Sequence, residues 1–271
     1  MNLLIKLPTR ERPEKFFKTL LRYQHLRTNE NTKFLITLDA NDTKMNNQNV
    51  INSLSMWGNL TFVYGESNNK IHACNRDLNE YTQDWDIVLL ASDDMIPQVE
   101  GYDDMIIAAM KEHFPDTDGV LHFNDGYTKE KLNTLCIAGR KYYERDKYLY
   151  NPEYISLWSD NEWQLVSEKR GKSVYIDTVI IKHEHPMNTN TAKMDASYQK
   201  TLAYYAEDKL TFERRKAMNF GLDALAFPED LKFTEDKSKD VISTTAVFFT
   251  ETRDLEIKPK NKGGRPKKVT V

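Results

Sequence analysis

The chain has 271 residues, of which 39% are apolar and 29% charged, and its net charge is −3 at pH 7. This length suits one large domain with appendages, and the mixed charge gives no preference for polyanions over the whole surface. Two isolated cysteines exclude a disulfide framework, the N-terminal apolar run is too short for a signal peptide, and no stretch approaches the roughly 20 apolar residues of a membrane span, so we expect a soluble cytoplasmic protein.

Strand and helix patterns alternate along the first half of the chain. Strands are predicted at 3–9, 33–42, 60–67, 86–94 and 119–125, and helices at 13–26, 46–57, 71–82 and 101–114. This alternation predicts an α/β fold with a mostly parallel central sheet and helices on both faces.

Polar residues gather where the predicted strands end, as with Thr9, Asp39, Glu66, Asp93 and Asp94. The carboxyl ends of parallel strands share one edge of the sheet, and ligands bind there. No GxGxxG or Walker loop occurs, and the chain has only 10 glycines. We therefore expect a divalent cation to bridge carboxylates and a nucleotide diphosphate.

Five segments occur in a characteristic order: IKLPTRERPEKF, ITLDAND, ASDDM, WSDNEWQLV and IKHEHP. Together they resemble nucleotide-sugar glycosyltransferases of the GT-A fold, close to the family-2-like group, over roughly residues 1–200. The resemblance implies a Rossmann-like GT-A catalytic domain at 1–190. A helical extension at 191–228 and a C-terminal extension at 229–271 would follow it.

The resemblance also implies which residues bind the donor nucleotide. The base and ribose would be lined by Pro8, Thr9, Arg10 and Arg12. Asp39 would hold the base. Ser92, Asp93 and Asp94 stand where the family has its DxD motif, with serine in place of the first acid, and we favour Asp94 as the metal ligand. Lys70 and Asn75 follow the third predicted strand and are weaker candidates for phosphate contacts.

Catalytic and further metal residues are implied near residues 160 and 183. Asp160 and Glu162 match the region of the family's catalytic base, although both also suit the first turn of a helix. His183 and His185 match a late metal-binding histidine; two residues apart on a strand they share a face, and we expect one to touch the metal. Mn²⁺ or Mg²⁺ accepts oxygen ligands, and Mn²⁺ also tolerates an imidazole.

The C-terminus is locally basic, with Lys258, Lys260, Lys262, Arg265, Lys267 and Lys268. Gly264-Arg265-Pro266 among these lysines resembles an AT-hook, which lays an arginine into the narrow minor groove of A·T-rich DNA, although Gly263 replaces the hook's preceding arginine. Lysine-rich tails are more often only solvated. A DNA-binding tail would suggest a hydroxymethylated base in double-stranded DNA as acceptor, as in bacteriophages that modify their genomes.

The sequence thus predicts a metal-dependent hexosyl- or pentosyltransferase, inverting rather than retaining, that uses a nucleotide diphosphate sugar such as a UDP-sugar. The same fold could act on a surface glycan or a protein. A nucleotidyltransferase would also place metal-binding acids at a strand end. A non-catalytic DNA-binding accessory protein on a GT-A scaffold is the third alternative.

Overall fold

The computed structural model describes residues 1–186 and 195–226. The strands are β1 (Leu3–Thr9), β2 (Lys33–Asp39), β3 (Leu60–Gly65), β4 (Ile87–Leu90), β5 (Met95–Pro97), β6 (Val120–Phe123), β7 (Cys136–Gly139), β8 (Ser173–Ile176) and β9 (Ile181–His183). The α-helices are α1 (Pro13–Leu26), α2 (Gln48–Ser55), α3 (Lys70–Asn75), α4 (Tyr102–His113), α5 (Arg140–Tyr143), α6 (Ser159–Lys169), α7 (Ala196–Leu202) and α8 (Tyr205–Ala217). Two 3₁₀ segments cover Lys129–Lys131 and Asn219–Ala226.

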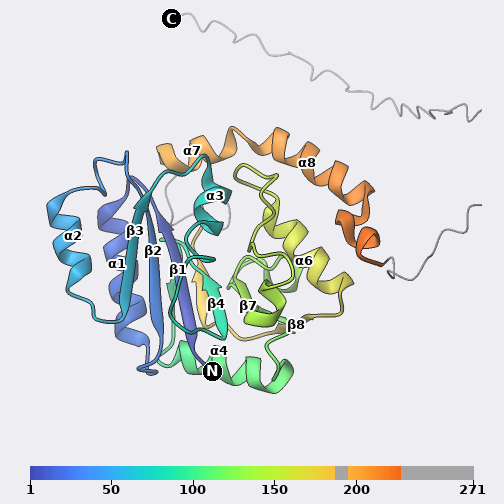
Figure 1. Cartoon of the computed structure of the whole chain (residues 1–271), viewed down its shortest axis with the longest axis horizontal. Coiled ribbons are helices and arrows are strands. Elements are labelled where there is room, and N and C mark those ends of the chain that lie inside the picture. The colour runs from blue at the N-terminus through green and yellow to red at the C-terminus, as the bar shows by residue number, and fades with distance from the viewer. Residues whose placement is uncertain (187–194, 227–271) are drawn as a thin grey trace, which may run out of the picture. The chain divides into compact units, whose positions relative to one another are not determined.

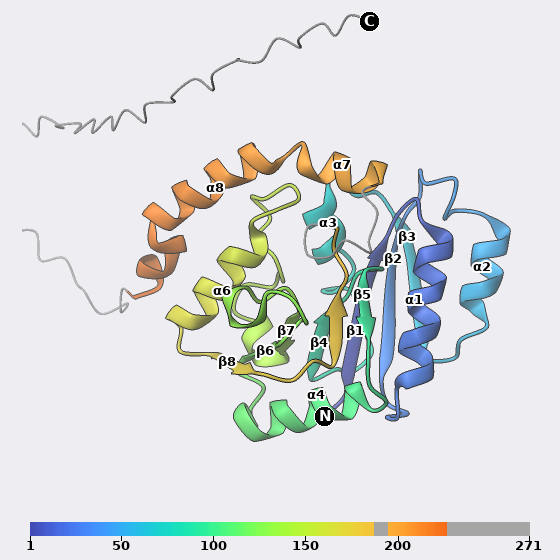
Figure 2. The same ribbon diagram turned by 180° about the vertical axis from the view of Figure 1, so that it is seen from behind.

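Seven strands form one sheet in the order β3-β2-β1-β4-β7-β6-β8. Strands β1 to β4 are parallel to one another, β8 is parallel to β6, and β7 runs antiparallel to both of its neighbours. The prediction of a mostly parallel sheet is confirmed. The carboxyl ends of β1, β2 and β4 therefore lie together at one edge, and α7 crosses above that edge (Figures 1 and 2).

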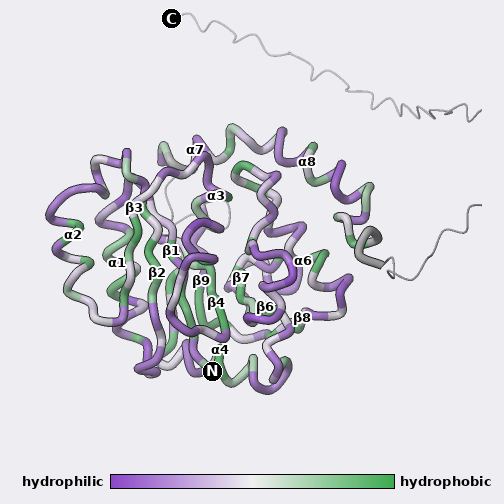
Figure 3. Tube along the Cα trace, viewed as in Figure 1, coloured by the Kyte–Doolittle hydropathy of each residue, from purple (hydrophilic) through white to green (hydrophobic). Residues whose placement is uncertain are grey.

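Apolar side chains cover both faces of the sheet because successive residues of a strand point to opposite sides. On one face Leu3, Ile5 and Leu7 of β1 pack with α1, α2 and α4, and on the other Leu4 packs with α3, α5, α6 and α8. In Figure 3 the apolar colouring gathers on strands such as β2 and β4. The helices thus lie on both faces, as the sequence predicts.

The structure differs from the sequence prediction mainly around the fourth strand. β4 ends at Leu90, and the chain then leaves the sheet so that Met95–Pro97 pairs with β9 in a separate two-stranded sheet. The acids Asp93 and Asp94 occupy the turn between these strands, where both side chains are buried. The predicted helix at 71–82 is confined to Lys70–Asn75.

The described residues lie within the compact unit Met1–Phe227. The predicted basic tail therefore lies outside the described residues. Within residues 1–186 and 195–226, no helix combines the length and the apolar character needed to cross a membrane.

Candidate functional site

The ends of β1 and β2 carry polar atoms that are buried without partners. Thr9 aligns with Leu38 of β2, and Asp39 is the next residue. The buried Asp39 carboxylate accepts a hydrogen bond from Arg10 Nη1 at 2.5 Å, and its Oδ1 has no partner among the described residues. Thr9 Oγ1 is likewise buried without a hydrogen-bond partner among the described residues, and Pro8 precedes Thr9 within β1. Such atoms are uncommon in proteins, and at a strand edge they indicate a polar ligand.

Asp93 is neutralised by two cations that α1 places beside it. Its carboxylate lies 2.9 Å from Arg12 Nε and 3.5 Å from Lys15 Nζ, with the side chain 4% exposed. Thr19 Oγ1 donates to the backbone carbonyl of Asp93 at 2.8 Å. Burial raises the pKa of Asp93, while Arg12 and Lys15 act in the opposite direction. Lys15 and Thr19 share one side of α1 because residues four apart are neighbours on a helix, and Arg12 is the residue directly before this helix.

Asp94 is held by three groups from separate parts of the chain. Ser92 Oγ and the Tyr198 hydroxyl donate to its two oxygens, the latter at 2.9 Å, and His183 Nε2 lies 3.7 Å from Oδ1. Burial works to raise the pKa of Asp94, but His183 and the Ser92 hydrogen bond outweigh it, so this pKa lies below its ordinary value. Asp94 is therefore a carboxylate at neutral pH.

The two histidines lie close together beside Asp94. β9 pairs with β5 so that His183 stands opposite Met95, which returns the imidazole to the acidic turn. The rings of His183 and His185 are 5.8 Å apart, and His185 packs edge-on against Tyr198 at 4.9 Å. Burial lowers the pKa of His185 to about 4, so this ring is neutral at pH 7. His183 Nδ1 is buried without a hydrogen-bond partner.

Asp160 stands in the first turn of α6. Its Oδ1 accepts from Asn161 N at 3.0 Å, and the helix cap is Trp158 rather than Asp160. Burial raises the pKa of Asp160, and the nearby charges of Lys70 and His183 lower it. A partly buried carboxylate with a raised pKa has the character of a general base.

Glu162 lies on the opposite side of α6. Two residues along a helix are about 200° apart around its axis, so Asp160 and Glu162 cannot face the same site. The Glu162 carboxylate accepts from Arg215 Nε and Nη2, each at 2.7 Å, and from the Tyr154 hydroxyl at 2.8 Å. The Glu162 carboxylate is thus committed to Arg215 and Tyr154, whereas the sequence could not distinguish it from Asp160 as a candidate base.

Arg215→Ala is expected to lower the free energy of unfolding by about 3 to 5 kcal/mol, because the buried Glu162 carboxylate would lose its counter-charge. The two side chains are 11% and 6% exposed, so solvent screens the pair little. Urea denaturation measures the change. The double replacement Glu162→Met with Arg215→Leu should recover most of the loss; an unchanged stability of Arg215→Ala would contradict the role of the pair.

The two weaker phosphate candidates have different surroundings. Asn75 Nδ2 donates to the Tyr150 carbonyl at 2.6 Å, and its Oδ1 accepts from Leu149 N and Tyr150 N at 2.9 and 3.1 Å. Both ends of the Asn75 amide thus hold a loop, which is not the predicted phosphate contact. Lys70 is exposed at the first residue of α3, on the side of Asp160.

The residues at the edge suit a cation that a diphosphate helps to hold. Within the described ranges, no three His, Cys, Asp or Glu side chains gather as a complete metal site. Asp94 and His183 form a carboxylate–imidazole pair, however, and Mg²⁺-type sites commonly use one or two protein ligands together with substrate phosphates and water. His183 Nδ1 in this pair, and Asp39 Oδ1 and Thr9 Oγ1 at the ends of β2 and β1, are buried without hydrogen-bond partners among the described residues.

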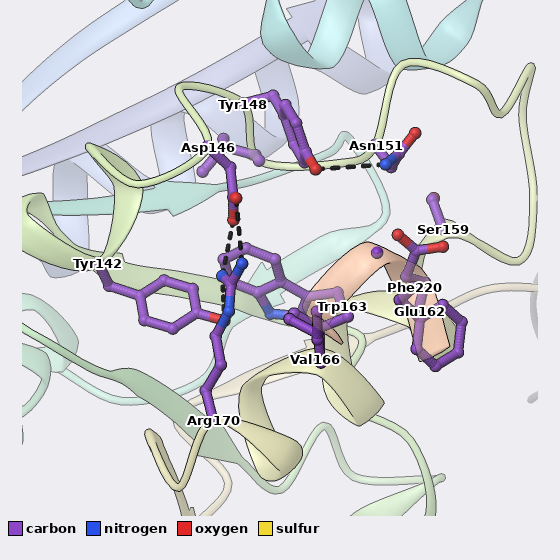
Figure 4. A pocket seen from close by; sticks show the side chains of 13 residues that line it. Tyr142, Asp146, Tyr148, Asn151, Ser159, Glu162, Trp163, Val166, Arg170 and Phe220 are labelled. Carbon is purple, nitrogen blue, oxygen red and sulfur yellow. Dashed lines mark hydrogen bonds and ion pairs between the residues drawn. The ribbon is translucent and has the colours of Figure 1, made fainter. Parts of the chain in front are cut away.

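A cavity of about 210 Å³ lies elsewhere, on the Glu162 face of α6. Figure 4 shows it between Tyr142, Tyr148, Trp163 and Phe220, with the Arg170–Asp146 ion pair at one wall. None of the strand-edge residues lines it. Because the paired acids and the histidines lie at the sheet edge, we place the candidate site there rather than in this cavity.

Two residues of the site, Lys15 and Tyr198, were not predicted from the sequence. Lys15 could have been found, since it lies three positions after Arg12, in the first turn of α1. Tyr198 gave no signal: it belongs to α7, yet its hydroxyl accepts from Lys15 Nζ at 2.7 Å, and Arg12 stacks over its ring at 4.9 Å. Asp195 begins this helix by accepting from Tyr198 N at 3.0 Å, which fixes the ring's position.

No protein-family model matches the chain, and no curated protein matches it by sequence. Solved structures do match. The mannosyltransferase PcManGT from Pyrobaculum calidifontis, in complex with GDP-Man and Mn²⁺, has a TM-score of 0.53 at 13% identity, over 68% of this chain and 56% of that one. S. aureus TarS 1-349 has a TM-score of 0.54 at 13% identity, over 82% and 75%. The same protein in complex with UDP-GlcNAc gives 0.51 at 14% identity, over 77% and 66%.

At these identities the likeness shows the fold. The chain spans a little over half the length of the mannosyltransferase it matches. The predicted GT-A-like architecture is confirmed: a mostly parallel seven-stranded sheet with helices on both faces, like that of nucleotide-sugar glycosyltransferases.

Proposed function

We propose that this protein is a metal-dependent glycosyltransferase that moves a sugar from a nucleotide diphosphate sugar, such as a UDP-sugar, to a hydroxyl group. The observation that carries the proposal is the pairing of Asp94 with His183 at the carboxyl edge of a GT-A-like sheet, with Asp160 near enough for the charge of His183 to act on its pKa. Structures of the same fold hold GDP-Man with Mn²⁺ or UDP-GlcNAc, which supports a nucleotide-sugar donor.

In this proposal the loop after β1 and the end of β2 bind the nucleoside. Asp39 and Thr9 each offer a buried oxygen without a partner among the described residues, which suits the polar edge of a base or a ribose. Pro8 and Arg10 flank these groups. Arg12 and Lys15 lie beside the acidic turn and supply positive charge near the diphosphate.

Asp94 and His183 would hold Mn²⁺ or Mg²⁺ together with the donor's phosphates, with His185 beside them. When bound, the cation stabilises the negative charge that builds on the departing diphosphate. Ser92 and Tyr198 keep the Asp94 carboxylate in place through their hydroxyl groups.

Asp160 would act as the general base. It would take the proton of the acceptor hydroxyl as the oxygen forms its bond to the anomeric carbon and the bond to the diphosphate breaks. A single displacement of this kind inverts the anomeric centre, and it needs one free carboxylate. Glu162 does not take part, because Arg215 holds its carboxylate on the other face of α6.

A screen of UDP- and GDP-sugars tests the proposal, with release of nucleoside diphosphate measured in Mn²⁺, in Mg²⁺ and in EDTA. We expect metal-dependent release of UDP from at least one UDP-sugar. Release of pyrophosphate instead would indicate a nucleotidyltransferase. If no nucleotide binds in Mn²⁺ by calorimetry, a non-catalytic scaffold is the better description.

For the acceptor we propose a hydroxymethylated base in double-stranded DNA. The support is the basic AT-hook-like sequence around Gly264-Arg265-Pro266, which lies outside the described residues. Glycine and proline keep such a segment slim enough for the minor groove, where the arginine meets concentrated negative potential. A surface glycan or a protein is the competing acceptor.

Deleting residues 258–271 is expected to abolish most transfer to hydroxymethylated duplex DNA while leaving hydrolysis of the nucleotide sugar intact. Affinity for DNA should fall at least about tenfold, since the deletion removes six cationic side chains. Fluorescence anisotropy and a radiolabelled-sugar assay measure the two effects. Unchanged DNA affinity and unchanged transfer after the deletion would refute the DNA acceptor.

A further inference from the structure

Asp208 of α8 holds a short loop directly before α6. Its carboxylate accepts from the backbone N–H groups of Ile155, Ser156 and Leu157, at 2.8, 2.8 and 2.7 Å. The side chain is fully buried. Three consecutive amide groups aimed at one charged carboxylate form a strong, directional clamp, because hydrogen bonds to an ionised acceptor are stronger than neutral ones.

The residue that follows this loop has an unfavourable backbone. Trp158 has φ 63° and ψ −10°, the left-handed region that bulky side chains rarely adopt. Its ring packs against Tyr205 at 5.5 Å and Phe212 at 5.1 Å, both on α8. Such a conformation persists only where the surroundings impose it, and here α8 does so.

A second set of contacts fixes the segment on both sides of Trp158. Arg214 and Arg215 pair with Glu153 before the loop, and Arg215 pairs with Glu162 after it. Helix α8 thus grips the chain before and after the left-handed turn. Asp160 lies within the gripped segment, two residues after Trp158, and α8 does not reach the strand edge through any of these contacts.

We infer that Asp208 is a positioning residue, which sets the turn at Trp158 and thereby aims the carboxylate of Asp160 at the acceptor hydroxyl. This inference rests on the proposed function of Asp160. The inference gives α8, in the helical extension, a role in catalysis although α8 does not contact the donor. Asp208 should therefore affect the chemical step more than donor binding.

The test compares Asp208→Ala, which removes the acceptor oxygens, with Asp208→Asn, which keeps one of them. Amide hydrogen exchange of the peptide covering residues 155–160 should accelerate about 10-fold or more in Asp208→Ala and less in Asp208→Asn. The value of kcat should fall by about 10- to 100-fold in Asp208→Ala, as for other residues that orient a reacting group, and by less in Asp208→Asn. The Kd for UDP in Mn²⁺ should stay within about twofold.

Glu207→Gln is the matched control, because it replaces the exposed carboxylate next to Asp208 on α8, which holds none of the three amide groups. It should leave kcat and the exchange of residues 155–160 near wild type. Circular dichroism checks that each variant is folded. If Asp208→Ala does not fold, the milder Asp208→Asn still tests the inference.

Faster exchange with an unchanged kcat, while Asp160→Asn is inactive, would overturn the inference and leave Asp208 a purely structural residue. Unchanged exchange would overturn it as well. If the wild-type protein transfers no sugar at all, the proposed function is what fails. The inference is then decided by the crystal structure of Asp208→Asn: a displaced Asp160 side chain supports it, and an unmoved one refutes it.

Discussion

Replacing Asp160 by Asn is expected to lower kcat for sugar transfer by about 10²- to 10⁴-fold, the usual contribution of a general base. Asparagine has nearly the same shape, so the loss would report the missing proton acceptor rather than a cavity. Donor binding should remain, because Asp160 belongs to α6 and is not among the residues proposed to hold the nucleoside or the cation. Steady-state rates and calorimetry with UDP in Mn²⁺ measure the two quantities separately.

Glu168→Gln is the control for this change. It replaces an exposed carboxylate on the same helix, with Gln164 as its partner, and it should leave kcat near wild type. If Asp160→Asn retained full kcat, the catalytic base would have to be another residue.

The pH dependence gives an independent check on Asp160. Burial raises the pKa of this carboxyl group, so the group takes up a proton at a higher pH than an ordinary aspartate, which titrates near about 3.9. Only the deprotonated form accepts a proton, so kcat should fall on acidification while the pH is still above that value. A profile of kcat against pH shows this fall on the acidic side, and stability is monitored in parallel to exclude unfolding. Its midpoint at or below the ordinary value would contradict the assignment.

Asp94→Asn is expected to weaken Mn²⁺-dependent binding of UDP by at least about 100-fold. Residues that merely orient a metal ligand commonly contribute 10- to 100-fold, and a ligand itself should contribute more. The change also removes the charge that faces His183 Nε2 at 3.7 Å. Calorimetry in Mn²⁺ and in EDTA measures the affinity for UDP. In EDTA the wild type and Asp94→Asn should bind UDP equally.

Asp84→Asn provides the matched control, since Asp84 is an exposed aspartate in the loop before β4 and outside the site. It should bind UDP as the wild type does. Equal metal-dependent affinity of Asp94→Asn and wild type would remove Asp94 from the metal site and with it the central support of the proposed function.

The local chemistry of the sequence determined most of the fold. The pattern of apolar residues placed β1 at Leu3–Thr9 and α1 at Pro13–Leu26, with the same bounds in the structure. The alternation of strands and helices predicted a parallel sheet, and a parallel sheet necessarily collects the ends of its strands at one edge. The position of Asp93 and Asp94 at that edge followed from these short-range patterns. The short strands β5, β7, β8 and β9 were not among the predicted strands, because strands of three or four residues carry little pattern of their own.

Tertiary structure alone decided how the side chains of the site are used. The sequence placed Asp160 and Glu162 on one helix but could not tell which side of α6 faces the sheet edge, since packing against α8 sets the rotation of that helix. Asn75 was available to a phosphate in the sequence and holds a loop in the structure. Tyr198 reaches Asp94 from 104 positions away. Contacts of this kind depend on the path of the whole chain, and no short stretch of residues encodes them.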